Sequence, residues 1–168
     1  FIVHLGITVI GIGVIGSTLF QAETQRNLRV GEALEFGGYT MRFDGLDRNQ
    51  IAEDNRIMDI ANLTLIRDGQ VIATLRPRHD FFPQAQDMNV MNIAGAHSTV
   101  ENDFYVLLAA FSDDGSSATF KVYINPLINL IWWGGLILIL GTLISVAPSE
   151  SAPARVREAA ALKAGARA

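Results

Sequence analysis

One histidine lies inside an apolar stretch at the start of the chain. His4 is the single ionisable side chain in FIVHLGITVIGIGVIGSTLF, residues 1–20. Such a group is costly in lipid, so it usually faces the interior of a helix bundle and marks a function or a cofactor. A neutral histidine is the commonest metal ligand in proteins, and two facing histidines hold a haem axially. The alternative is a histidine that hydrogen-bonds a neighbouring helix or lies near water.

The residues near His4 leave space beside its ring. At about 100° per residue, Thr8, Gly11 and Ile15 fall within about 40° of His4 around a helix. We expect Thr8 and Gly11 to face a flat group held by His4. Axial binding on both sides needs a second histidine, which must then lie on a helix outside this sequence. His79 and His97 belong to a polar segment, where surface or loop packing is expected.

The other residue types exclude several chemistries. The chain has no cysteine, so it forms no disulfide, cysteine-ligated metal site or thiol nucleophile. No P-loop, HExxH motif or Ser-His-Asp set is recognisable, and GIGVIG follows no strand, so it is not a dinucleotide fingerprint. Glycine in a membrane helix more often serves close packing. With 13 basic and 17 acidic residues, nothing favours nucleic acid.

Two apolar segments must position these residues. Residues 1–20 and 126–147 predict transmembrane helices, because about 20 residues without charge span a bilayer core. A signal peptide would need a basic region and an A-x-A-like cleavage site, which residues 1–20 lack. In the second segment, a small-residue stripe predicts helix packing, and the two tryptophans predict an aromatic belt. The stripe comprises Gly134, Leu138, Gly141 and Ser145, and the tryptophans are Trp132 and Trp133.

Charge predicts the orientation of the chain. Residues 148–168 form a tail, expected to be flexible, with Arg155, Arg157, Lys163 and Arg167 close to the second helix. Basic residues near a helix end mark the cytoplasmic side. We therefore expect the polar segment 21–125 on the opposite side, in the periplasm of a Gram-negative bacterium. Because the chain begins with Phe1 inside an apolar run, we also expect it to be a piece of a longer polypeptide.

The polar segment reads as an all-β domain. YTMRFDG alternates apolar and polar residues with the period of a half-buried strand, and Asp68-Gly69 predicts a tight hairpin turn. About six strands and no helix are expected, in a small antiparallel sandwich or open barrel. Residues 76–101 are less regular, and Pro77 and Pro83 predict a long excursion. Its apolar residues are expected to pack on the core of the domain, with a partner as the alternative: Phe81, Phe82, Met88, Val90, Met91 and Ile93.

Five stretches, in order, resemble the C-terminal part of the CcmF family, haem lyase subunits of bacterial cytochrome c maturation. They are HLGITVIGIGVIGS, RNLRVGEALEFGGYTMRFDGL, RDGQVIATLRPRHDFFP, DFYVLL and KVYINPLINLIWWGGLILILGTLIS. The resemblance covers residues 1 to about 147. The related subunit of nitrite reductase maturation shares the pattern.

The resemblance implies a multi-pass protein of the bacterial inner membrane with a periplasmic β-domain. Such proteins take haem from the chaperone CcmE and, with CcmH-type subunits, attach it to apocytochrome c through thioethers. The family carries a haem b between two transmembrane histidines, and His4 corresponds to one of them. The Trp-rich haem-handling segment and the family's two periplasmic histidines belong upstream, so this chain is not expected to be active alone.

The leading hypothesis is therefore a haem lyase fragment with His4 as an axial ligand of the haem b iron. A rival hypothesis is a membrane-anchored periplasmic scaffold without a cofactor, in which His4 packs against protein. A third is an accessory subunit of a transporter, which would need further ionisable residues in the membrane; the two apolar segments contain only His4.

Overall fold

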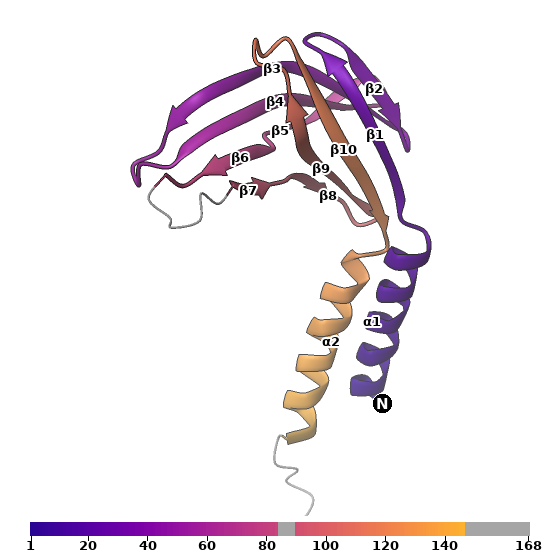
Figure 1. The fold of residues 1–168 in the computed structure, drawn as a ribbon. Coiled ribbons are helices and arrows are strands. Elements are labelled where there is room, and N and C mark those ends of the chain that lie inside the picture. Colours follow the sequence, from indigo (N-terminus) through magenta and orange to yellow (C-terminus); the bar gives the residue numbers. More distant parts are fainter. Residues whose placement is uncertain (84–89, 147–168) are drawn as a thin grey trace, which may run out of the picture.

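One helix precedes the β-domain in the sequence and one follows it, and the two helices lie side by side beneath the domain (Figure 1). The structure, a computed structural model, describes residues 1–83 and 90–146. Helices α1 (Ile2–Leu19) and α2 (Asn129–Val146) are each long and apolar enough to cross a membrane. The predicted tail, residues 148–168, lies outside the described residues, as does Met88.

The β-domain is a sandwich of two antiparallel sheets, which confirms the predicted fold class. One sheet has the strand order β1-β10-β9-β8, and the other has the order β2-β3-β4-β6-β7, with β5 also paired to β4. The strands are β1 (Ala22–Arg29), β2 (Ala33–Phe36), β3 (Tyr39–Ile51), β4 (Ile57–Arg67), β5 (Gln70–Leu75), β6 (Arg78–Phe81), β7 (Val90–Ile93), β8 (Gly95–Ser98), β9 (Asn102–Phe111) and β10 (Ser117–Pro126).

Alternation along the strands builds the core. On β3, Tyr39, Met41 and Phe43 are buried as predicted, because successive side chains of a strand point to opposite faces. They meet the buried face of the other sheet, where the Phe43 and Phe120 rings are 5.1 Å apart between centroids. The β4–β5 turn also follows the prediction: Asp68 and Gly69 have φ angles of 53° and 76°, the left-handed values of a two-residue hairpin turn.

Three expectations differ from the structure. The described residues form ten strands instead of about six, and the predicted excursion contains three short strands, β6 to β8. Pro77 does interrupt the chain between β5 and β6, yet its carbonyl accepts a hydrogen bond from the Ala61 amide, so pairing with β4 resumes at Arg78. Helix α2 begins at Asn129 rather than 126, because Leu127 has a φ of 61° and turns the chain between β10 and the helix.

Candidate functional site

Helices α1 and α2 pack closely through glycines. A Cβ atom built on Gly6 would lie 2.7 Å from the Leu138 amide nitrogen, and one on Gly141 would lie 2.8 Å from the Val3 nitrogen. A Cβ on Gly13 would likewise meet Ile131 at 2.9 Å. The helices run antiparallel, since the start of α1 meets the end of α2. Small residues let helix backbones approach in this way.

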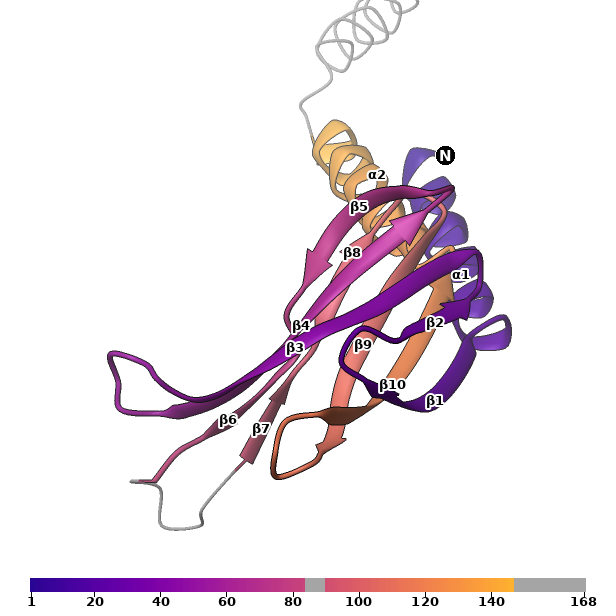
Figure 2. The same cartoon turned by 90° about the horizontal axis from the view of Figure 1, so that it is seen from above.

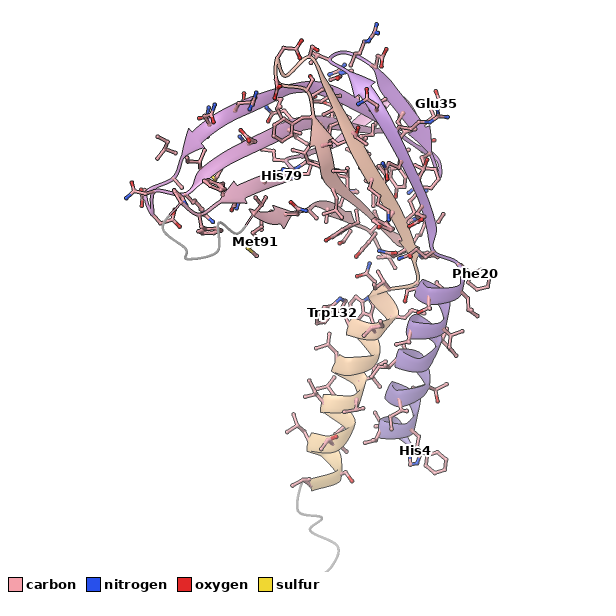
Figure 3. The ribbon with its side chains drawn as sticks, in the orientation of Figure 1. His4, Phe20, Glu35, His79, Met91 and Trp132 are labelled. Atoms are coloured by element: carbon pink, nitrogen blue, oxygen red, sulfur yellow. The ribbon has the colours of Figure 1, made fainter. Side chains whose placement is uncertain are left out.

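His4 lies on the side of α1 that faces away from α2. Around the helix, Gly6 and Gly13 fall within about 20° of the direction opposite to His4. The His4 side chain is exposed, and Figure 3 shows it at the end of α1 far from the β-domain. About 24 Å of helix separates it from Phe20, at 1.5 Å per residue. The face that carries His4 is therefore available to another group.

The residues beside His4 fit a flat ligand. A Cβ atom built on Gly11 has no neighbouring atom within 4 Å, so the space next to this glycine is open. Thr8 donates its hydroxyl to the His4 backbone carbonyl at 2.9 Å, which satisfies the hydroxyl within the helix. The imidazole is thus the group on this face suited to bind iron, and Gly11 leaves room for a porphyrin edge.

The glycine stripe of α2 was predicted correctly, whereas that of α1 was identified only in part. Gly134 and Gly141 are buried against α1, and Leu138 contacts Gly6. In GIGVIG, Gly13 packs on α2 and Gly16 packs on Leu127 in the turn before α2, whereas Gly11 has no neighbour within 4 Å. Sequence reasoning missed Gly6. Its spacing of seven residues from Gly13, two helical turns, was the signal that would have placed both on one face.

The two other histidines belong to the β-domain. His79 lies on β6, half-buried, with Nε2 2.6 Å from the Leu108 carbonyl and its ring 5.6 Å from that of Phe111. His97 is half-buried on β8. Both therefore lie in strands rather than loops, and His79 has a packing role. No group of three or more His, Asp or Glu suited to a metal ion occurs within residues 1–83 and 90–146.

The junction between domain and helices is held by hydrogen bonds. Asn129, the first residue of α2, donates its side-chain amide to the Thr99 carbonyl and to Asp103 Oδ1, the latter at 3.3 Å. The Leu127 amide donates to the Glu101 carbonyl at 3.0 Å. The Leu127 side chain also packs on Gly16 of α1. These contacts hold the helix pair against one end of the sandwich.

Comparison with known proteins identifies relatives along nearly the whole chain. A family model described as the CcmF C-terminal beta-sandwich matches residues 19–126. The chain is 32% identical over 162 residues to the cytochrome c-type biogenesis protein CcmF of Pseudomonas aeruginosa, covering 95% of this chain and 24% of the relative. It is 28% identical over 144 residues to the probable cytochrome c-type biogenesis protein NrfE of Escherichia coli, covering 86% of the chain and 25% of the relative.

A solved structure shares the fold. The structure of a cytochrome c heme lyase CcmF superposes with a TM-score of 0.69 at 26% identity, over 88% of this chain and 24% of that one. The chain thus spans about a quarter of the length of the relatives it matches.

Proposed function

The chain belongs to the CcmF family, and on that premise we propose that it supplies one haem ligand and a periplasmic domain to a cytochrome c haem lyase. The whole protein would deliver haem and attach it covalently to apocytochrome c. The haem chaperone CcmE and CcmH-type subunits are its expected partners, and the bacterial inner membrane is its expected location.

The observation that carries the proposal is the placement of His4 opposite the α1–α2 contact. If His4 were a packing histidine of the helix pair, its ring would point towards α2. Instead the contact is made by Gly6 and Gly13, and the imidazole remains on the free face with Gly11 and Thr8. A second histidine from another helix of the full-length protein would complete the axial pair.

The residues of this chain have separate roles in the proposed site. His4 would hold the iron of a haem b through a ring nitrogen, and Gly11 would leave its flank open to the porphyrin. The closed α1–α2 contact would exclude solvent from one side of α1. A haem bound there supplies electron transfer when present. The β-domain, fixed to the helix pair through Asn129, would shield the periplasmic side or dock partners.

The test is a reduced-minus-oxidised difference spectrum of the purified full-length protein carrying His4→Ala. We expect loss or displacement of the b-type signal, because one axial ligand is removed. Leu5→Ala is the matched control, since Leu5 is exposed at the same depth but lies about 100° away around the helix. A b-type signal that His4→Ala leaves unchanged would refute the ligand role and favour the scaffold hypothesis.

A further inference from the structure

One part of the β-domain projects beyond the sandwich. This part, the arm, comprises residues 47–60, 78–81 and 90–93, contributed by β3, β4, β6 and β7. Figures 1 and 2 show the arm reaching sideways past β9 and β10 and past the helix pair, on the side of α2. Its tip therefore extends over space that the described residues do not fill.

The tip of the arm carries a row of apolar side chains across four strands. Ile51 pairs with Ile57, Ile57 with Phe81, and Phe81 with Val90. Directly paired residues of neighbouring strands point to the same face of a sheet. Ile51 is 73% exposed and Val90 54% exposed, so the apolar row is accessible at both of its ends.

The apolar row is separate from the core of the sandwich. Its neighbouring row on the same face is polar, with Asp59 paired to His79 and His79 paired to Asn92. Asp59 accepts a hydrogen bond from the Asn49 amide at 2.9 Å, and His79 contacts the Leu108 carbonyl. None of the four apolar residues belongs to the core cluster. The expectation that Phe81 and Val90 pack on that core is therefore wrong.

A buried ion cluster holds the arm in place from its opposite face. Asp80 is fully buried, and its carboxylate accepts hydrogen bonds from Arg56 Nη1 at 3.0 Å and Arg78 Nε at 2.8 Å. A buried carboxylate is costly unless it is paired and hydrogen-bonded, so this cluster favours one arrangement. Arg56 comes from the β3–β4 turn and Asp80 from β6, and their contact ties the tip to the next strand. The ion cluster, rather than the hydrophobic core, therefore holds the strands that carry the apolar row in place.

We propose that the apolar row of the arm packs against a segment of the same full-length polypeptide that lies outside residues 1–168. The relatives are about four times as long as this chain, so most of the polypeptide must be placed around it. Exposed apolar patches mark interaction sites, and lasting contacts are the more apolar ones.

The exposed face of α2 supports a contact with the same segment of the polypeptide. Trp132 is 73% exposed, and in Figure 3 it projects from α2 on the side over which the arm extends. A segment rising from the membrane beside α2 would cover Trp132 first and the apolar row next. This inference rests on family membership and on the register of the arm; it does not depend on the role of His4.

The test places a photo-crosslinking residue in the apolar row of the full-length protein. The full-length protein carrying Ile51→p-benzoylphenylalanine is irradiated in native membranes and purified under denaturing conditions. Its crosslinked peptides are then identified by mass spectrometry. We expect crosslinks from the arm to peptides outside residues 1–168, with the mass of the single polypeptide unchanged. Val71 is the matched control, because it is also a β-strand residue, 66% exposed, but lies on β5 outside the arm. Val90 provides a second position in the row.

Several outcomes would overturn the inference. An adduct of higher mass would show that a second copy or another protein covers the row. Lipid adducts, crosslinks confined to residues 1–168, or crosslink yields no greater than at Val71 would show that no other part of the polypeptide covers the apolar row. Because Ile51 and Val90 are exposed, neither substitution disturbs the core, and correct folding is checked by the yield of membrane-inserted protein.

Discussion

At the scale of single residues, helix α1 has two different faces, one that packs on α2 and one that carries His4. Gly6 allows the backbones of α1 and α2 to touch, because a Cβ there would lie 2.7 Å from the Leu138 nitrogen and 2.9 Å from the Gly134 oxygen. Neither backbone atom can rotate away as a flexible side chain would. His4, two residues earlier, lies on the other side, where Gly11 leaves open space. Helix α1 therefore packs closely on α2 through one face and leaves His4 free on the opposite face.

The close contact predicts the effect of a single methyl group. Gly6→Ala should destabilise the α1–α2 pair by about 1–3 kcal/mol, because the added Cβ overlaps backbone atoms. Gly135→Ala is the control: a Cβ there has no neighbour within 4 Å, and alanine favours the helix. Thermal unfolding of the 168-residue chain in detergent compares them, since α1 and α2 are the helices that pack together within its described residues. Equal melting temperatures for the two variants would contradict the packing described.

At the scale of elements, the β9–β10 hairpin depends on one carboxylate. Asp114 accepts hydrogen bonds from the Ser112 hydroxyl at 2.6 Å, the Ser116 amide at 3.0 Å and the Ser116 hydroxyl at 2.8 Å. These donors, the Ser112 hydroxyl first, lower the pKa of Asp114 to about 2. Gly115, with a φ of 72°, completes the turn. The charged carboxylate therefore stabilises the loop that joins the two longest strands of its sheet.

The lowered pKa predicts a pH dependence. A depressed folded-state pKa contributes stability above the unfolded value, about 3.9, and this stability is lost as the pH falls towards about 2. Asp114→Asn should therefore lower the melting temperature by a constant amount above about pH 5. Below about pH 4 the difference in melting temperature between the variant and the unaltered protein should become smaller. Melting curves measured from pH 7 to pH 3 give the comparison, and a difference that stays constant to pH 3 would contradict it.

At the scale of the whole molecule, the antiparallel helix pair fixes which parts share a side. The start of α1 and the end of α2 both lie far from the β-domain (Figure 1). If the pair crosses a membrane, these two helix ends therefore lie on one side of it and the domain lies on the other. The basic residues predicted to be cytoplasmic come after α2 in the sequence, beginning at Arg155, and lie outside the described residues.

This arrangement predicts the outcome of reporter fusions. A reporter active only in the cytoplasm should work when fused after Ala168 of the full-length protein. A reporter active only in the periplasm should work when inserted after Gly69, in the exposed β4–β5 turn. Turn tips of this kind tolerate insertions. Activities in the reverse pattern would invert the orientation derived from the four basic residues.

The sequence by itself determined the features that short stretches encode. Two apolar segments predicted α1 and α2, the alternation around Met41 predicted a half-buried strand, and Asp68-Gly69 predicted a hairpin turn. Helical spacing also grouped Thr8 and Gly11 with His4. Each of these follows from the geometry of a few consecutive residues, so no distant part of the chain was needed to find them.

Only the tertiary structure decided which surfaces meet. The four-residue strands β6, β7 and β8 are too short for a periodic signal, and their pairing depends on partners far away in sequence. The cluster around Asp80 and the apolar row ending at Ile51 and Val90 arise from that pairing. In the same way, the sequence proposed His4 as a ligand, but only the placement of Gly6 and Gly13 against α2 showed that the face carrying His4 is free. Contacts between distant residues depend on how elements pack in space, which local sequence patterns do not specify.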